Sequence, residues 1–123
     1  MDKKKILVAD DEPNIRLLVI GMLSHDYIVI AASDGEEAIA LAKTQKPGLI
    51  LMDIMMPETD GYVACSILKA DPATKAIPVV MLTGVGHELN KKLAKEVGAD
   101  GYVTKPFGRE ELLEAVTPLL EPK

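Results

Sequence analysis

The chain has 123 residues, the usual size of one domain, so we expect a single domain over residues 1–123 whose folded part runs from about residue 4 to residue 120. Hydrophobic residues make up 48% and aromatic residues only 3%, which predicts an aliphatic core, and the single cysteine excludes an internal disulfide. The net charge of −5 argues against direct nucleic-acid binding, and no apolar run approaches the roughly 18 residues of a membrane span, so we expect a soluble cytoplasmic protein without membrane contact.

Five short apolar runs punctuate the chain. They are continuous instead of alternating with polar residues, which is typical of parallel strands covered on both faces. The runs lie at 6–9, 28–32, 49–52, 78–82 and 101–103. These segments predict five strands.

The segments between and after these runs have helical periodicity. Pro13 suits a first helical position, and Asp34 with Glu37 predicts a capping box. Gly98 is a natural helix stop, whereas Pro118 is expected to bend or end the last helix. The predicted helices span 13–23, 35–44, 61–70, 88–97 and 109–120. Five strands alternating with five helices predict an α/β fold with a doubly wound parallel sheet.

Polar side chains stand where the predicted strands end. Asp10 and Asp11 follow the first strand and Asp53 follows the third. Thr83 follows the fourth strand, and Lys105 lies just beyond the fifth. Because ligands of open parallel sheets bind outside the carboxyl ends of the strands, we expect these residues to meet at one edge.

Each of these residues also has a simpler interpretation. Asp11 and Glu12 could cap the first helix, and Asp53 could be a turn residue. Thr83 could cap the following segment, and Lys105 could be a solvated side chain. Taken together, however, the simpler interpretations give no reason for acids to end the first and third strands.

Electrostatics favours a shared cation site. Carboxylates that crowd together repel one another and raise at least one pKa, and a divalent cation removes that repulsion. Oxygen ligands with high negative charge suit Mg²⁺, which serves phosphoryl chemistry. Lys105 could then pair with one phosphoryl oxygen and the Thr83 hydroxyl could donate to another. The combination predicts a carboxylate that accepts a phosphoryl group.

The chain carries five motifs in order, which are VADDE at 8–12, LMDIMMP at 51–57, DG at 60–61, VMLTG at 80–84 and YVTKPF at 102–107. Asp53 and Thr83 are 30 residues apart, and Thr83 and Lys105 are 22 residues apart. With these motifs and separations, the sequence resembles the receiver domain of response regulators in two-component signalling, from Lys4 to about Leu120. The resemblance implies a flavodoxin-like three-layer (βα)5 sandwich with strand order 2-1-3-4-5.

The resemblance also implies a metal-assisted phosphorylation site. Asp53 corresponds to the phosphoacceptor. Asp11 and Asp53 correspond to direct Mg²⁺ ligands, with Asp10 acting mainly through bound water. The backbone carbonyl of Met55 corresponds to the third protein ligand.

The resemblance further implies a switch. Thr83 and Lys105 correspond to the pair that senses the phosphoryl group, Lys105–Pro106 to a cis peptide bond, and Tyr102 to the switch aromatic. The expected donor is the phosphohistidine of a histidine kinase or phosphotransfer protein. Segments 88–97, 101–103 and 109–120 would then present a changed face to a downstream protein partner or effector domain, or to a second copy in a phosphorylation-dependent dimer. Such a domain catalyses only its own phosphoryl uptake and loss, so we do not expect an enzyme.

Three other functions fit the sequence less well. A phosphatase of the haloacid dehalogenase type needs a second Asp two residues after its nucleophile, where this chain has Met55. A flavodoxin-like flavin carrier needs a hydroxyl-rich phosphate loop after the first strand, but Asp10 and Asp11 would repel a phosphate there. The complete acidic set argues against a degenerate receiver that only binds partners.

The lifetime of the phosphoryl group depends on residues beside the acceptor. Met55 stands two residues after Asp53, and Val85 stands two residues after Thr83. Neither side chain can hold an attacking water by hydrogen bonds, which predicts slow self-dephosphorylation. The alternative that both residues only cover the loop stays open.

Overall fold

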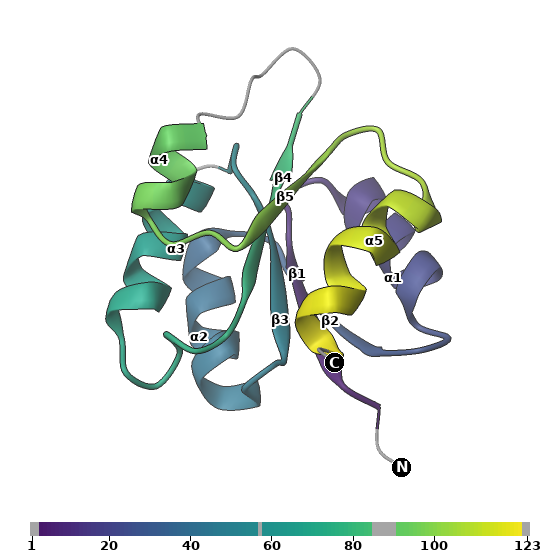
Figure 1. Cartoon of the computed structure of the whole chain (residues 1–123), viewed down its shortest axis with the longest axis horizontal. Helices are drawn as coiled ribbons and strands as arrows, with labels where there is room; N and C mark the ends of the chain where they lie inside the picture. The colour runs from purple at the N-terminus through teal and green to yellow at the C-terminus, as the bar shows by residue number, and fades with distance from the viewer. Residues whose placement is uncertain (1–2, 57, 85–90, 122–123) are drawn as a thin grey trace.

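The computed structural model describes residues 3–56, 58–84 and 91–121. Strands and helices alternate along the chain, as the sequence pattern predicts (Figure 1). The strands are β1 (Lys5–Ala9), β2 (Ile28–Ala32), β3 (Leu49–Asp53), β4 (Val79–Thr83) and β5 (Gly101–Thr104). The helices are α1 (Pro13–Leu23), α2 (Gly35–Gln45), α3 (Gly61–Ala70), α4 (Lys91–Glu96) and α5 (Arg109–Leu120). The first three residues of the helix predicted at 88–97 lie outside the described part of the chain.

The five strands form one parallel sheet with the order β2-β1-β3-β4-β5. Figure 1 shows α1 and α5 on one face of this sheet and α2, α3 and α4 on the other. The predicted α/β class, the three-layer architecture and the strand order implied by the resemblance are therefore confirmed. This order places β1, β3 and β4 side by side, so their carboxyl ends meet.

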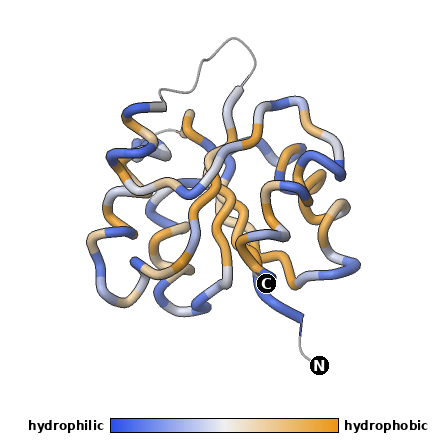
Figure 2. The backbone as a smooth tube through the Cα atoms, in the orientation of Figure 1, coloured by the Kyte–Doolittle hydropathy of each residue, from blue (hydrophilic) through white to orange (hydrophobic). Residues whose placement is uncertain are grey.

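The sheet divides the core into two aliphatic clusters. Successive side chains of a strand point to opposite faces, so Ile6 and Val8 pack with α1 and α5, whereas Leu7 and Ala9 pack with α2 and α3. The strands form the hydrophobic centre of the molecule (Figure 2). Because β1, β3 and β4 are covered on both faces, they hold the residues at their ends on a rigid platform.

Local capping starts two helices near the same edge of the sheet. Asp34 Oδ1 accepts a hydrogen bond from Glu37 N at 2.8 Å, as the capping-box pattern predicts. In a capping box the Glu37 carboxylate would accept from the N–H of Asp34, but here it accepts from Ser33 N at 2.6 Å, one residue earlier. Asp60 caps α3 in the same way through Val63 N at 2.9 Å.

Pro118 does not end α5, which continues to Leu120. The predicted span 109–120 is therefore confirmed, and Pro118, which was expected to bend or end the helix, lies two residues before its last residue. Leu120 is buried in the core, and the Lys4 ammonium donates to the Leu120 carbonyl. Every helix in the described ranges is too short or too polar to cross a bilayer.

Candidate functional site

The strand order brings the predicted polar residues to one edge of the sheet. Asp10 directly follows β1, Asp53 is the last residue of β3, and Thr83 is the last residue of β4. Lys105 directly follows β5, and its backbone N–H donates to the Thr83 carbonyl at 2.7 Å. Residues that are far apart in the sequence thus share one site, as the strand-end rule predicts.

Asp53 lies at the bottom of this site with only 2% of its surface exposed. Its Oδ1 accepts a hydrogen bond from Met55 N at 3.3 Å and lies 3.5 Å from the Lys105 ammonium. Both contacts fall on Oδ1, so Oδ2 is the oxygen available to an incoming group. Gly61 packs directly on the backbone of Asp53, since a Cβ there would lie 2.3 Å from the Asp53 carbonyl oxygen.

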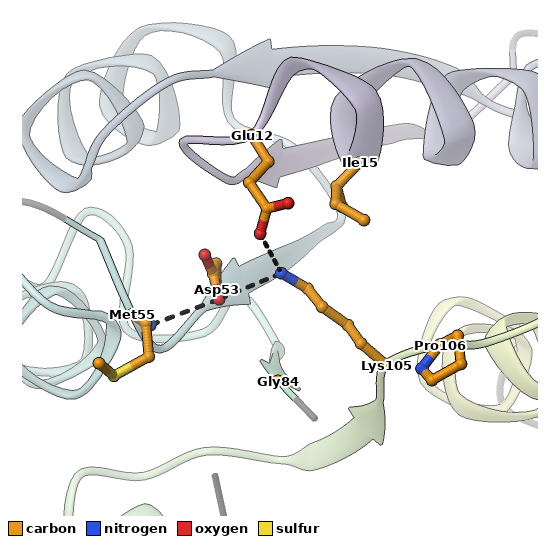
Figure 3. A pocket seen from close by; sticks show the side chains of 7 residues that line it. All are labelled: Glu12, Ile15, Asp53, Met55, Gly84, Lys105 and Pro106. Atoms are coloured by element: carbon orange, nitrogen blue, oxygen red, sulfur yellow. Dashed lines mark hydrogen bonds and ion pairs between the residues drawn. The ribbon is translucent and has the colours of Figure 1, made fainter. Parts of the chain in front are cut away.

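Lys105 extends from the end of β5 into the site and contacts three carboxylates. Its Nζ lies 2.8 Å from Asp10 Oδ2 and 3.7 Å from Glu12 Oε1, in addition to its contact with Asp53. Figure 3 shows Glu12, Asp53 and Lys105 pointing toward one another. One ammonium therefore partly compensates the charge of the whole acidic group.

The acidic turn between β1 and α1 brings three carboxylates together. One oxygen from each of Asp10, Asp11 and Glu12 lies within 4.8 Å of the others. Glu12 N donates to Asp10 Oδ1 at 2.9 Å, and Glu12 starts α1 without a side-chain cap. The simpler interpretation, in which these acids cap the first helix, is therefore wrong for Glu12.

The donor set fits a hard divalent cation. Asp10 Oδ2 is buried, has no regular hydrogen bond in the described part of the chain, and is contacted as an ion pair by Lys105. Oxygen ligands with a surplus of negative charge are those that Mg²⁺ prefers. The spatial cluster contains Glu12, which the sequence interpretation treated only as a cap, and Asp53 lies beside the cluster without belonging to it.

The electrostatic environment shifts the pKa values of Asp53 and Lys105. Burial, together with the negative charge of Asp10, raises the pKa of Asp53 to about 7, although Lys105 acts in the opposite direction. Burial alone would lower the pKa of Lys105, but the close contact with the Asp10 carboxylate and the charges of Asp53 and Glu12 raise it above its usual value. The raised pKa of Asp53 therefore comes first from burial and second from the neighbouring carboxylate of Asp10.

A cleft of about 520 Å³ opens beside Asp53 (Figure 3). Its lining combines the charged groups with apolar side chains and comprises Glu12, Ile15, Asp53, Met55, Gly84, Lys105 and Pro106. The cleft gives a partner access to the otherwise buried carboxylate. Its apolar member Ile15 was not predicted as a site residue, because side-chain positions beyond a strand end depend on the loop geometry, whereas Pro106 was predicted as the partner of Lys105 in a cis peptide bond.

The remaining predicted residues are placed as follows. Thr83 is buried, with 3% of its surface exposed, whereas Tyr102 on β5 is 47% exposed. The Lys105–Pro106 peptide bond is cis. The Met55 side chain is 54% exposed at the cleft, and Val85 lies outside the described residues. The roles of Thr83, Tyr102 and the Met55 carbonyl stay predictions.

Comparisons with known proteins agree with this geometry. The profile described as response regulator receiver domain matches residues 6–117. The alkaline phosphatase synthesis transcriptional regulatory protein PhoP of Bacillus subtilis is 45% identical over 118 residues, which are 95% of this chain and 48% of that protein. The chain thus spans about half the length of this relative.

Solved structures share the whole fold. The chemotaxis protein CheY4 of Vibrio cholerae superimposes with a TM-score of 0.88 at 33% identity, covering 96% of this chain and 99% of that one. The receiver domain of the sensor histidine kinase PA1611 from Pseudomonas aeruginosa has a TM-score of 0.86 at 29% identity, with coverages of 96% and 98%. That structure holds a magnesium ion coordinated in the active site cleft.

Receiver domains of response regulators and of histidine kinases signal through phosphorylation and bind Mg²⁺ in the active site. Because the family profile covers well over half of the chain and the fold agrees with these relatives along nearly its whole length, this chain belongs to the response regulator receiver domain family.

Proposed function

We propose that Asp53 accepts a phosphoryl group from the phosphohistidine of a histidine kinase or phosphotransfer protein, and that the modified domain changes its contacts with a downstream protein partner or effector domain. The observation that carries this proposal is the position of Asp53. It is a buried carboxylate at the foot of an open cleft, with an acidic turn on one side and the Lys105 ammonium 3.5 Å away on the other.

The transfer uses groups that are already in place. Asp53 Oδ2 forms the new bond to phosphorus, while the bond from phosphorus to the donor nitrogen breaks and its electron pair stays on the donor imidazole. Oδ1 is held meanwhile by Met55 N and Lys105. The Lys105 ammonium contacts both the buried Asp10 and the exposed Glu12. From this position it can stabilise the negative charge that develops on the phosphoryl oxygens during transfer.

Mg²⁺, held by Asp11, Asp53 and the Met55 carbonyl with Asp10 acting through water, would neutralise charge on the transferred oxygens. The chain itself contributes the carboxylates that concentrate negative charge beside Asp53. The raised pKa of Asp53, about 7, follows from its burial and from the charge of Asp10. A cation that relieves this repulsion also favours the ionised carboxylate, which is the form that attacks phosphorus.

The proposed response of the domain involves the end of β4 and the middle of β5. A phosphoryl group on Asp53 would draw the buried Thr83 hydroxyl toward it, and Tyr102, now half-exposed, would move inward. Thr83 on β4 pairs with Thr104 on β5, and Tyr102 lies two residues before Thr104. Thr83 and Tyr102 are therefore on neighbouring strands. We infer a population shift that changes the surface of α4, β5 and α5.

The domain is proposed to act only on itself. A phosphatase of external esters needs an acid to protonate the leaving group, and the thioether of Met55, which lines the cleft, cannot serve as one. Phosphoryl uptake and loss at Asp53 would therefore constitute a switch and not a turnover cycle.

Phosphorylation with acetyl phosphate tests the assignment. Intact-mass measurement should show one phosphoryl group on the wild type only when Mg²⁺ is present, and none on Asp53→Asn. Asp34→Asn is the matched control, because it changes a partly exposed acid away from the cleft to an amide that still caps α2, and it should be phosphorylated normally. Uptake that persists in Asp53→Asn, or that needs no divalent cation, contradicts the proposal.

The switch needs a separate readout. The chain has three tyrosines and no tryptophan, so the ring signals of Tyr102 can be followed by NMR. Addition of beryllium fluoride with Mg²⁺ should shift the Tyr102 ring signals in the wild type and leave them unchanged in Asp53→Asn. Unchanged signals in a wild-type protein that has bound beryllium fluoride would contradict the switch but not the phosphorylation.

A further inference from the structure

We propose that Arg16 is a positioning residue for the divalent cation. Its guanidinium holds the peptide carbonyl of Asp10 and thereby directs the carboxylate of Asp11 toward the metal. The inference rests on the proposed function, because it concerns the Mg²⁺ site of the same phosphorylation reaction. It adds a residue from α1 that contributes no ligand of its own.

The contact is short and lies at a critical point of the chain. Arg16 Nη1 donates to the Asp10 backbone oxygen at 2.7 Å, in a partly buried position. Asp10 is the first residue after β1, and its N–H still pairs with the Ala32 carbonyl at 3.1 Å. Its carbonyl lies beyond the strand, so Arg16 takes the place of a sheet partner and fixes the orientation of the Asp10–Asp11 peptide.

With this contact, every polar group of Asp10 is engaged. Its backbone N–H and oxygen are held by Ala32 and Arg16, Oδ1 accepts from Glu12 N, and Oδ2 pairs with Lys105. The Asp11 carboxylate, in contrast, is exposed and makes no hydrogen bond or ion pair with any residue that the structure describes. Its direction therefore depends on its backbone, which is held from the Asp10 side by Arg16.

The first turn of α1 supports the same arrangement. Ile15 N and Arg16 N both bond to the Glu12 carbonyl, at 3.1 and 3.2 Å. Arg16 is thus anchored to the acidic turn through its backbone and returns to that turn through its side chain. A guanidinium is planar and always charged, so it holds a carbonyl in a better-defined direction than a flexible ammonium does.

Two simpler roles for Arg16 make different predictions. If Arg16 only contributed positive charge near the acids, its removal would strengthen the binding of a cation, because one like charge would be gone. If it only tied α1 to the sheet, its removal would lower the stability of the metal-free protein and leave Mg²⁺ affinity unchanged. A positioning role predicts weaker Mg²⁺ binding in spite of the lost positive charge.

Isothermal titration with Mg²⁺ alone separates these roles. We expect Arg16→Met to raise the Kd for Mg²⁺ about tenfold, the lower end of the effect usual for residues that orient metal ligands. The chain has one other arginine, which provides a matched control. Arg109 also donates to a backbone carbonyl, that of Met22 at 3.1 Å, and forms an exposed ion pair with Asp26 at 3.0 Å. Arg109→Met thus removes the same charge and a carbonyl contact away from the metal site, and it should leave the Kd unchanged.

Phosphorylation by acetyl phosphate gives a second readout. The Mg²⁺ concentration for half-maximal rate should rise by the same factor in Arg16→Met, while the rate at saturating Mg²⁺ stays near that of the wild type. Arg16→Lys keeps the charge and one donor, so its Kd should lie between those of the wild type and Arg16→Met. Should Arg16→Met fail to fold, Arg16→Lys decides: weaker binding supports the proposal and wild-type affinity overturns it.

The outcomes distinguish this inference from the proposed function. A wild-type protein that binds no Mg²⁺ and takes up no phosphoryl group overturns both. A wild type that does both, with an Arg16→Met variant whose Kd is unchanged or lower, overturns only the role of Arg16.

Discussion

Lys105 Nζ and Asp10 Oδ2 lie 2.8 Å apart, with only 11% and 0% of their side chains exposed. A carboxylate in such a place is costly to leave without a partner, even when the pair itself adds little net stability. Lys105 therefore compensates the charge of the buried acids.

The first prediction concerns the removal of this ammonium. In the presence of a chelator, Lys105→Met should lower the free energy of unfolding by about 3 kcal/mol, because Asp10 stays buried without its partner. Addition of Mg²⁺ should raise the free energy of unfolding more in the variant than in the wild type. Urea denaturation with chelator and with Mg²⁺ measures both effects.

A surface pair is the control for this measurement. Lys43 lies 3.4 Å from Asp71 with side chains that are 49% and 30% exposed, so Lys43→Met should cost less than about 0.5 kcal/mol in either medium. Equal losses for the two lysine variants would contradict the compensating role of Lys105.

The second prediction concerns the pH dependence of stability through Asp53. Its pKa is about 7 in the folded chain and 3.8 for the ordinary group, so the folded state holds more protons between these values. Stability from this group therefore falls as the pH rises through that window. Asp53→Asn removes the effect, and its stability relative to the metal-free wild type should grow by about 2–3 kcal/mol from about pH 5 to about pH 8.

Denaturation curves in chelator at several pH values check this expectation. A difference between Asp53→Asn and the wild type that is the same at all pH values would show that Asp53 is ionised throughout, contrary to its buried environment.

The sequence predicted much of this site because the signals involved are simple ones. Asp10, Asp53 and Thr83 each follow or end an apolar run, and parallel strands bring such residues to one edge wherever the strands are neighbours. The cap at Asp34 was predictable for a similar reason, since it links residues three positions apart. The strand order itself came from the family resemblance, because the alternation of strands and helices does not determine which strands are neighbours.

The contacts that the sequence did not predict depend on three-dimensional detail. Glu12 belongs to the acidic cluster because the turn after β1 brings its carboxylate back toward Asp10. Arg16 reaches the Asp10 carbonyl from the start of α1, at a distance that helical periodicity does not reveal. Leu120, two residues beyond Pro118, is buried in the core, a contact that the local sequence pattern does not reveal.

The third prediction follows from the close approach of Gly61 to Asp53. A methyl group on Gly61 would meet the Asp53 carbonyl oxygen at 2.3 Å and Ile54 Cα at 2.8 Å, and both are backbone atoms that cannot move aside easily. Gly61→Ala should therefore lower the free energy of unfolding by about 3 kcal/mol and slow phosphorylation by displacing Asp53. Gly21→Ala is the control, since nothing lies within 4 Å of its added Cβ in α1, and it should stabilise the chain by about 0.5–1 kcal/mol. If both variants behave alike, steric contact at Gly61 is not what holds the end of β3.

The fourth prediction concerns the lifetime of the phosphoryl group on Asp53. Met55 is 54% exposed at the cleft, two residues after the acceptor, and its thioether is a weak hydrogen-bond acceptor with no donor. It cannot hold a water in position to attack phosphorus, so we expect slow decay. Met55→Asn provides an amide that both donates and accepts, and it should shorten the lifetime several-fold, whereas Met55→Leu keeps an apolar side chain and should leave it unchanged. Decay is followed by intact mass after the phosphodonor is removed. If the Asn and Leu variants decay at the same rate, Met55 only covers the loop, and the lifetime is determined elsewhere in the site.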